Sequence, residues 1–255
     1  MCVAAVAWLA HPRWRLVAIG NRDEYHERPA APLERRDDGT IAGRDLQSGG
    51  TWLGVSEATK RFVLVTNLRG FGLPDPARIS RGALVDGLLR GEGPHGDPAS
   101  APLDLFNPFN VIVADERSAT FLTNRPDALR TGLGPGIYGL SNGSLDEPWP
   151  KTLQLKAALL GWIEAGDDKF DPLFAALRSE TLVSGGLAPH GPSDVPAEPA
   201  QTPPFIRSPV YGTRCSTVVA IEHSGEGRAG RGRIAERRFD LLGDPAGETA
   251  LDFSA

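Results

Sequence analysis

The sequence predicts an α+β protein with a layered architecture, and three observations support this fold class. Candidate strands outnumber candidate helices, the first two strands are apolar at nearly every position, and strands occupy both ends of the chain with helices between them. Strands that are apolar on both faces belong in a sheet that is covered on both sides. Strands, then helices, then strands again favour an α+β arrangement over a doubly wound one.

The first predicted element is a β-hairpin. Residues 2–9 and 14–20 are rich in Val and Ala and are separated by His11-Pro12-Arg13, which indicates a turn between two strands. Further strands are predicted at 51–56, 61–68, 110–114, 119–123, 137–141, 213–222 and 233–240.

Three helices are predicted in the middle of the chain. The first begins after Ser80, a suitable N-cap, and ends at Gly91. The second runs from Pro150 to Gly166. We expect its apolar positions to be Leu153, Ala157, Leu160 and Ile163. A weaker third helix spans about 171–180, with Phe174 and Leu177 turned inward.

We expect residues 1–255 to fold as one domain. The composition includes 30 Gly and 22 Pro residues, which indicates many turns around short strands. Residues 184–209 contain seven prolines and three glycines, and are interpreted as a long ordered loop or partly mobile flap within that domain.

Charge and apolar runs exclude several classes of protein. With 27 Lys and Arg against 32 Asp and Glu, the chain lacks the basic character of a nucleic-acid binder. The apolar run from Val3 to Ala10 is far shorter than the roughly 20 residues of a membrane span. No basic segment precedes it as in a secretory signal, so a cytoplasmic protein is expected. Two cysteines are too few for a disulfide framework, and the five histidines show no paired spacing on one helical face, so no metal site is predicted.

Cys2 is the most informative position. Initiator methionine is usually removed before a small residue, which would leave Cys2 with both a thiol and a free α-amine. An α-amine titrates near ~8 and a thiol near ~8.5, so the amine can take the thiol proton. The alternative is a small second residue that merely permits methionine removal.

Four polar residues, Asn21-Arg22-Asp23-Glu24, follow the second strand directly. In an antiparallel hairpin the start of one strand lies beside the end of the other, so Cys2 should lie close to Arg22 and Asp23. A guanidinium there lowers the pKa of a thiol, and a carboxylate can hold the α-ammonium. The alternative is a surface ion pair that contributes little. Because adjacent residues face opposite sides of a strand, either a bulge re-aims one of them or only one reaches Cys2.

Several motifs occur in a characteristic order along the chain. They are Asn21–Glu24, Gly49–Gly54, Thr66-Asn67, Ser80–Gly82, Gly139–Asn142 with Pro148–Lys151, and Tyr211–Ser216. Together they make the sequence resemble the NRDE family, which includes the Transport and Golgi organisation protein 2 homologues. The resemblance covers about residues 1–240 and implies an N-terminal nucleophile hydrolase-like fold, a four-layer αββα sandwich.

Penicillin V acylases and choloylglycine hydrolases, which share that fold, supply a more distant analogy for catalytic roles. It implies a nucleophilic cysteine with an Arg and an Asp beside it, asparagines in the oxyanion site and a later Arg. The residues that can fill these places are Cys2, Arg22, Asp23, Asn67, Asn142 and Arg214.

Three further expectations concern these residues. Asn142-Gly143 is equally consistent with a plain turn. Arg214 should point inward with Asp23 as its partner, and neighbouring Cys215 should point the other way as a small buried residue.

Two functions follow from this pattern. The first is a cysteine-dependent hydrolase of amide or acyl (thioester or ester) bonds, needing no cofactor; the alternative is a non-catalytic carrier of haem or of lipid or acyl-CoA. In either case the expected partner is a small molecule with an apolar body and an anionic group. Further contacts to this ligand are expected from Asn21, Glu24, Trp52 and Phe71.

Overall fold

The first strand shows why this chain forms layers. In the computed structural model, which describes residues 2–182, 202–224 and 230–255, strand β1 (Cys2–Trp8) is buried along its whole length. Val3 and Ala5 pack toward helices, whereas Ala4 and Val6 pack toward a second sheet. Successive side chains of a strand point to opposite faces, so one apolar strand contributes to two cores.

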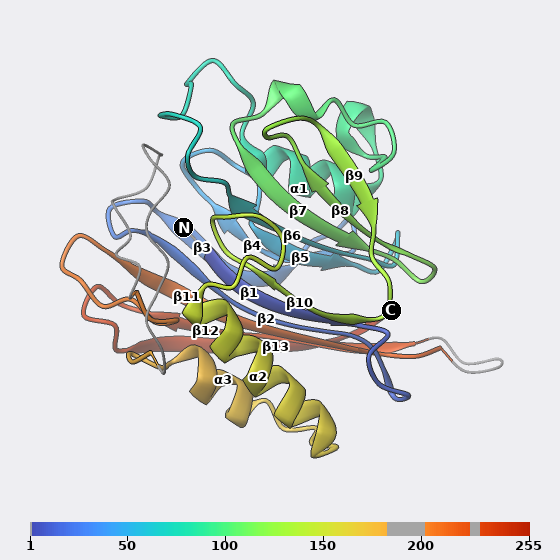
Figure 1. The fold of residues 1–255 in the computed structure, drawn as a ribbon, viewed down its shortest axis with the longest axis vertical. Helices are drawn as coiled ribbons and strands as arrows, with labels where there is room; N and C mark the ends of the chain where they lie inside the picture. Colours follow the sequence, from blue (N-terminus) through green and yellow to red (C-terminus); the bar gives the residue numbers. More distant parts are fainter. Residues whose placement is uncertain (1, 183–201, 225–229) are drawn as a thin grey trace.

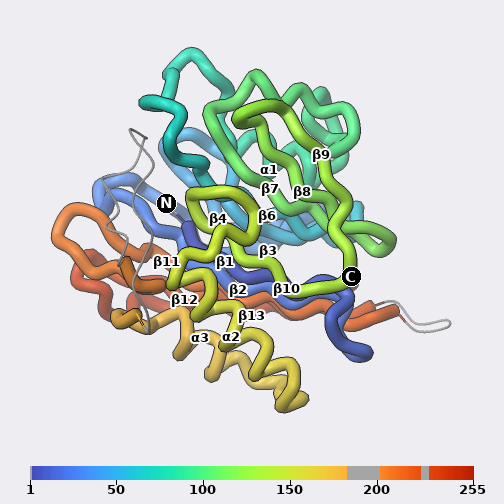
Figure 2. The backbone as a smooth tube through the Cα atoms, viewed as in Figure 1, coloured from blue at the N-terminus to red at the C-terminus, as the bar shows by residue number. Residues whose placement is uncertain are grey.

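The first sheet joins the beginning and the end of the chain. Its strand order is β10-β1-β2-β11-β12-β13, and every pairing is antiparallel. Figure 2 shows the blue N-terminal and orange-red C-terminal strands side by side. Besides β1, its strands are β2 (Trp14–Tyr25), β10 (Gly136–Leu140), β11 (Tyr211–Glu222), β12 (Arg231–Phe239) and β13 (Pro245–Ser254).

The second sheet follows the order of the sequence and is also antiparallel. Buried Glu236 on β12 accepts a hydrogen bond from the Leu33 backbone N–H of this sheet at 3.0 Å, which ties the two sheets together near the site described below. Its strands are β3 (Ala30–Arg35), β4 (Thr40–Asp45), β5 (Leu53–Ser56), β6 (Arg61–Asn67), β7 (Phe109–Ala114), β8 (Ala119–Thr123) and β9 (Leu129–Gly132).

Helices cover the outer face of each sheet (Figure 1). Helices α2 (Pro150–Glu164) and α3 (Asp171–Leu177) pack on the first sheet, and α1 (Arg81–Arg90) packs on the second. A third apolar cluster lies between the sheets. The α+β sandwich is therefore confirmed, with its layers in the order αββα. Short 3-10 turns, η1 (Gly93–His95) and η2 (Leu103–Leu105), follow α1.

The ends of α1 agree with the sequence signals. The Ser80 hydroxyl accepts a hydrogen bond from the Gly82 N–H, and Gly91 adopts the left-handed conformation with φ of 70°. Of the four apolar positions expected on α2, Ile163 is buried, whereas Leu153 and Leu160 are 47% and 44% exposed and Ala157 is also exposed. The buried face instead has i, i+4, i+7 and i+8 spacing. It consists of Leu155, Leu159, Trp162 and Ile163.

Four strands lack a clear sequence signal: β3, β4, β9 and β13. All residues of β9 are exposed, and β3 and β13 are edge strands with mostly polar or exposed positions, so no apolar pattern marks them. Residues 184–201 of the loop predicted at 184–209 lie outside the described residues. Its remaining residues, 202–209, form neither helix nor strand. Among the described helices, none is long and apolar enough to cross a membrane.

Candidate functional site

The hairpin register places Cys2 directly opposite Arg22. Cys2 is only 8% exposed. On its other side, the Ser141 hydroxyl donates a hydrogen bond to the Cys2 carbonyl oxygen at 3.1 Å. The expected proximity of Cys2 to the end of the second strand is therefore confirmed, and the backbone of Cys2 is held from both sides.

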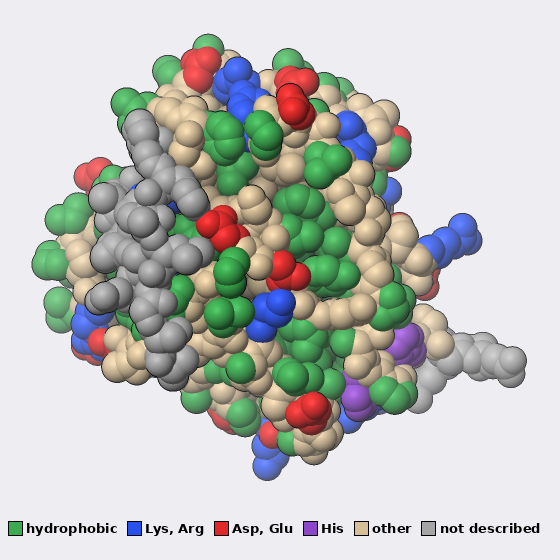
Figure 3. All heavy atoms as spheres, in the orientation of Figure 1, with side chains coloured by type: hydrophobic (Ala, Val, Ile, Leu, Met, Phe, Trp, Pro, Cys, Tyr) green, Lys and Arg blue, Asp and Glu red, His purple; other side chains and the backbone are tan. Residues whose placement is uncertain are grey.

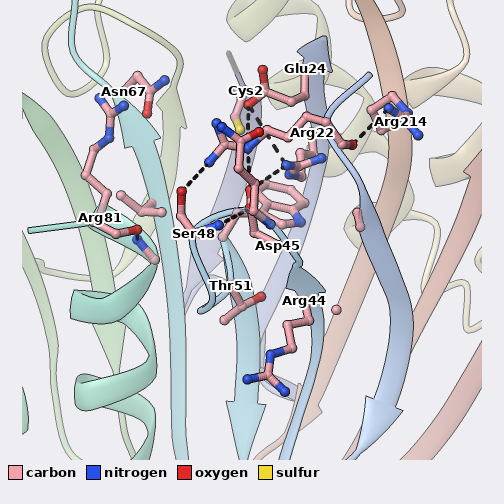
Figure 4. Close-up of a pocket in the computed structure, with 18 of the residues that line it drawn as sticks. Cys2, Arg22, Glu24, Arg44, Asp45, Ser48, Thr51, Asn67, Arg81 and Arg214 are labelled. Atoms are coloured by element: carbon pink, nitrogen blue, oxygen red, sulfur yellow. Dashed lines mark hydrogen bonds and ion pairs between the residues drawn. The ribbon is translucent and has the colours of Figure 1, made fainter. Parts of the chain in front are cut away.

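Cys2 and Arg22 line a cavity of about 720 Å³ to which both sheets and the start of α1 contribute (Figure 4). Its lining includes seven arginines and five acidic residues, so most of the charge there is paired. Both cysteines are among its lining residues. The charged ones are Arg22, Arg28, Arg44, Arg78, Arg81, Arg214, Arg238, Asp23, Glu24, Asp45, Asp75 and Glu236.

Asp45 holds Arg22 in place, a role that the sequence did not reveal. One Asp45 oxygen accepts hydrogen bonds from the backbone N–H groups of Gln47 and Ser48, each at 3.0 Å. The other oxygen accepts from Arg22 Nη2 at 3.0 Å and from Arg28 Nε at 2.6 Å. An Asp shortly before Ser48-Gly49-Gly50 indicates a turn, but no sequence pattern connects Asp45 to Arg22.

Asp45→Asn is expected to destabilise the fold by about 1–2 kcal/mol at pH 7, because it removes charge-assisted hydrogen bonds. Burial would raise the pKa of Asp45, but hydrogen bonds from Arg28 and Ser48 and the nearby arginine charges lower it below its ordinary value. The carboxylate therefore stabilises the folded state above its unfolded pKa of about 3.9, and this contribution is lost as pH falls through the lower folded pKa. Urea unfolding of both proteins across pH 3–7 should show the difference shrinking at the acidic end. A difference that stays constant with pH would contradict the ion-pair role.

Asp23 faces away from Arg22. It is 1% exposed, pairs in register with Thr213, and accepts a hydrogen bond from the Thr213 hydroxyl at 2.7 Å. The sequence allowed either a bulge in β2 or a regular strand in which one of Arg22 and Asp23 reaches Cys2. Pairing between β1 and β2 is regular, and Arg22 is the residue on the same face as Cys2. Asp23 nevertheless lines the cavity and is close enough to influence the thiol.

A β-bulge lies on β11 rather than on β2. Thr213 pairs with Asp23 and Cys215 pairs with Arg22, so Arg214 is the extra residue between them. The bulge brings both Arg214 and Cys215 to the cavity, and the expectation that Cys215 points the other way is wrong.

The partner expected for Arg214 is also different. Arg214 Nη1 donates to the backbone carbonyl oxygens of Tyr25 at 3.1 Å and His26 at 2.8 Å. The Asp23 carboxylate is instead turned to Thr213. The bulge is the physical reason, because it removes Arg214 from the regular pairing with β2.

The two thiols differ in their surroundings. Burial raises the pKa of Cys2, with contributions from Asp23 and Glu24, while Arg22 acts to lower it. Burial raises the pKa of Cys215 much more, aided by Glu236, to which the thiol is hydrogen-bonded. Because both cysteines flank Arg22 in register, their Cα atoms are two strand spacings apart, about 9.6 Å. This exceeds the reach of a disulfide, so the two thiols act separately.

The two asparagines expected in an oxyanion site have different positions. Asn67, at the end of β6, is half-buried and lines the cavity. Asn142 is fully buried outside the lining, and its amide donates to the Asn67 carbonyl oxygen at 2.8 Å. Asn142 therefore supports the backbone of Asn67.

Of the four expected ligand contacts, the structure brings two to the cavity. Glu24 and Trp52 line it. Asn21 is fully buried within β2, and its amide donates to the carbonyl oxygens of Leu177 and Pro204 and accepts from the Ser216 hydroxyl. Phe71 is 43% exposed and is outside the lining.

The side chains that line the site include thiols, guanidinium groups and carboxylates. Among the described residues, no group of three or more His, Cys, Asp or Glu side chains could hold an ion. On the face of the molecule in Figure 3, positive and negative side chains are interspersed with apolar and neutral ones. The chemistry available in the cavity is therefore that of a thiol next to a buried positive charge.

Comparison of the sequence with known protein families gives a match over most of the chain. The profile of the family described as Transport and Golgi organisation 2 matches residues 1–240. The chain belongs to the Transport and Golgi organisation 2 family. This agrees with the NRDE motif at 21–24, which the structure places at the end of β2 beside Cys2.

Mammalian members of the Transport and Golgi organisation 2 family are similar over most of their length. A Transport and Golgi organization protein 2 homolog from cattle is 33% identical over 233 residues, which cover 83% of this chain and 84% of the bovine protein. Homologs from mouse and human are 30% and 31% identical over the same extent.

Proposed function

We propose that this chain is a cysteine-dependent hydrolase of amide or acyl (thioester or ester) bonds, with Cys2 as its N-terminal nucleophile after removal of Met1. The observation that carries the proposal is the position of Cys2. Its side chain lines a cavity of about 720 Å³ directly opposite Arg22, and its backbone is held by β2 and Ser141.

The proposed reaction uses the α-amine of Cys2 as the base. The amine takes the thiol proton, and the thiolate attacks the substrate carbonyl to form a tetrahedral oxyanion. The oxyanion collapses, the bond to the leaving group breaks, and the leaving group takes the proton from the α-ammonium. Water then attacks the thioester, gives a proton to the α-amine, and the released thiolate recovers it as the acid product leaves.

Surrounding residues supply the charges that this reaction needs. Burial raises the pKa of the Cys2 thiol, Asp23 raises it too, and Arg22 lowers it. In the proposed reaction, the Asp23 carboxylate holds the α-ammonium. Asn67 is the one expected oxyanion residue in the cavity lining. An amide donor preorganised for an oxyanion typically contributes about 10²–10³ in rate.

Turnover of a panel of acyl substrates tests the proposal. Amide, ester and thioester derivatives of medium-chain acids are incubated with wild type, Cys2→Ala and Cys215→Ala. We expect turnover of at least one bond type by wild type and Cys215→Ala, and none above background by Cys2→Ala. Cys215 is the matched control, since it is a second buried thiol in the same cavity that lacks an α-amine. Equal turnover by wild type and Cys2→Ala would contradict the proposal.

A second candidate is a non-catalytic carrier of haem or of lipid or acyl-CoA. Burial raises the pKa of both cavity thiols. Without an α-amine beside them, the thiols therefore stay protonated near neutral pH, which favours a non-catalytic role. No histidine is among the described residues that line the cavity, so a haem ligand there would come from Cys2 or Cys215. A carrier would show saturable binding of haem, by a Soret shift, or of acyl-CoA, without turnover. An unchanged spectrum at micromolar haem would remove the haem option.

A further inference from the structure

Two arginines at the cavity present buried N–H groups that no described residue accepts. These groups are at Arg22 Nη1 and Arg214 Nε. The Arg22 side chain is only 10% exposed, so solvent has little access to it. A buried donor without a partner destabilises the folded state, and more so when it is charged, so an acceptor that reaches these groups from the cavity would stabilise both.

The remaining parts of both guanidinium groups are fixed. Arg22 Nη2 is bound to Asp45, and Arg214 Nη1 is bound to the Tyr25 and His26 carbonyl oxygens. The open N–H groups are therefore held in set directions rather than free to turn elsewhere. Both arginines line the same cavity; Arg214 is the bulge residue of β11, and Arg22 pairs in register with its neighbour Cys215.

The balance of charge at these two arginines favours an anion. Burial lowers the pKa of Arg214, and the nearby Arg22 lowers it further. The hydrogen-bond acceptors that Arg214 contacts are neutral carbonyl groups, which do not compensate its charge. Asp45 pairs with Arg22 Nη2 at 3.0 Å. Glu24 is farther from the same atom, at 3.9 Å, and its other oxygen accepts from the Tyr25 backbone N–H.

We propose that Arg22 and Arg214 form an anion subsite beside Cys2, and that its ligand is a carboxylate carried by the leaving group of the substrate. A carboxylate has two oxygens that can each accept one of the two charge-assisted hydrogen bonds. Figure 4 shows Arg214 on one side of Cys2 and Asn67 on the other. The acyl part then lies toward Asn67 and its neighbour Val65, which also lines the cavity. The assignment to the leaving group and this direction of binding rest on the proposed function; the anion subsite itself does not.

Alkylation of Cys2 tests the subsite without requiring hydrolysis. Iodoacetate and iodoacetamide have the same reactive carbon: the sulfur forms a bond to it, iodide leaves, and the thiol proton goes to solvent. Only iodoacetate carries a carboxylate. We expect the ratio of the Cys2 rate constants, iodoacetate over iodoacetamide, to be about tenfold higher in the folded protein than in the urea-unfolded chain, given the strength of hydrogen bonds between charged groups. Peptide mass spectrometry separates modification of Cys2 from that of Cys215.

Matched arginine variants locate the subsite. Arg214→Gln should return the ratio to nearly the unfolded value, whereas Arg44→Gln should leave it unchanged. Arg44 has the same charge and lines the same cavity, but Figure 4 shows it pointing away from Cys2. A ratio that is equal in folded and unfolded wild type, or that falls equally in both variants, would overturn the proposal.

A measurement on wild type alone covers the case in which Arg214→Gln does not fold. Sodium acetate should slow the iodoacetate reaction of folded wild type more than sodium chloride of equal ionic strength does, because acetate competes for the same donors. Equal slowing by the two salts would overturn the subsite. A high iodoacetate-to-iodoacetamide rate ratio in a protein that turns over no acyl substrate would support the anion subsite and contradict the hydrolase proposal.

Discussion

Arg22→Gln is expected to slow alkylation of Cys2 by iodoacetamide at pH 7.5 by about tenfold or more, because a rise of one unit in thiol pKa lowers the thiolate fraction about tenfold. Arg22 is paired in register with Cys2, and its positive charge lowers the pKa of this thiol against the opposing effect of burial. The measurement is the rate of Cys2 alkylation between pH 6 and 10. Its midpoint should move to higher pH in the variant.

Arg28→Gln is the matched control for this variant. Arg28 contacts the same Asp45 oxygen as Arg22 and lines the same cavity, but it does not pair with Cys2. Its loss should change the alkylation rate by less than about threefold, since partly exposed ion pairs act weakly. Equal slowing in both variants would mean that the thiol responds to the general charge of the cavity rather than to Arg22.

Asn21→Ala is expected to lower the free energy of unfolding by about 3–5 kcal/mol, because each buried polar group left unsatisfied costs about 1–3 kcal/mol. The Asn21 amide donates to two backbone carbonyls and accepts from the Ser216 hydroxyl, all in a fully buried environment. Such a loss is a large share of the stability of a typical protein, which is about 5–15 kcal/mol. Urea denaturation measures it.

Asn107→Ala provides the comparison, since the Asn107 side chain makes two hydrogen bonds to the backbone of Asp75 at the surface. We expect a loss of about 1 kcal/mol or less there. A stable Asn21→Ala protein whose Cys2 no longer reacts with iodoacetamide would show instead that Asn21 belongs to the reactive site, as the sequence had suggested.

Local geometry explains what the sequence predicts well. The apolar hairpin with its five-residue connection determines which residues face each other, so the proximity of Cys2 to Arg22 follows from antiparallel pairing. Burial of both faces of β1 predicts sheets covered on both sides, and the layers follow. These features depend on residues that are close in the sequence.

Features that depend on distant pairings could not be predicted in the same way. The bulge at Arg214 reflects how β11 pairs with β2, nearly two hundred residues away, and no local pattern marks it. The bulge reverses the expected direction of Cys215 and removes Arg214 from regular pairing with β2. Asp45 likewise reaches Arg22 only because the end of β4, in the second sheet, lies next to β2 of the first sheet.

The mass of the protein during turnover tests the central claim most directly. Intact protein and its N-terminal peptide are analysed by mass spectrometry after brief incubation with an acyl substrate and acid quenching. The account predicts that Met1 is absent and that an acyl group is bound to Cys2, with no adduct in Cys2→Ala. Protein that turns over substrate while retaining Met1 in its whole population would contradict it.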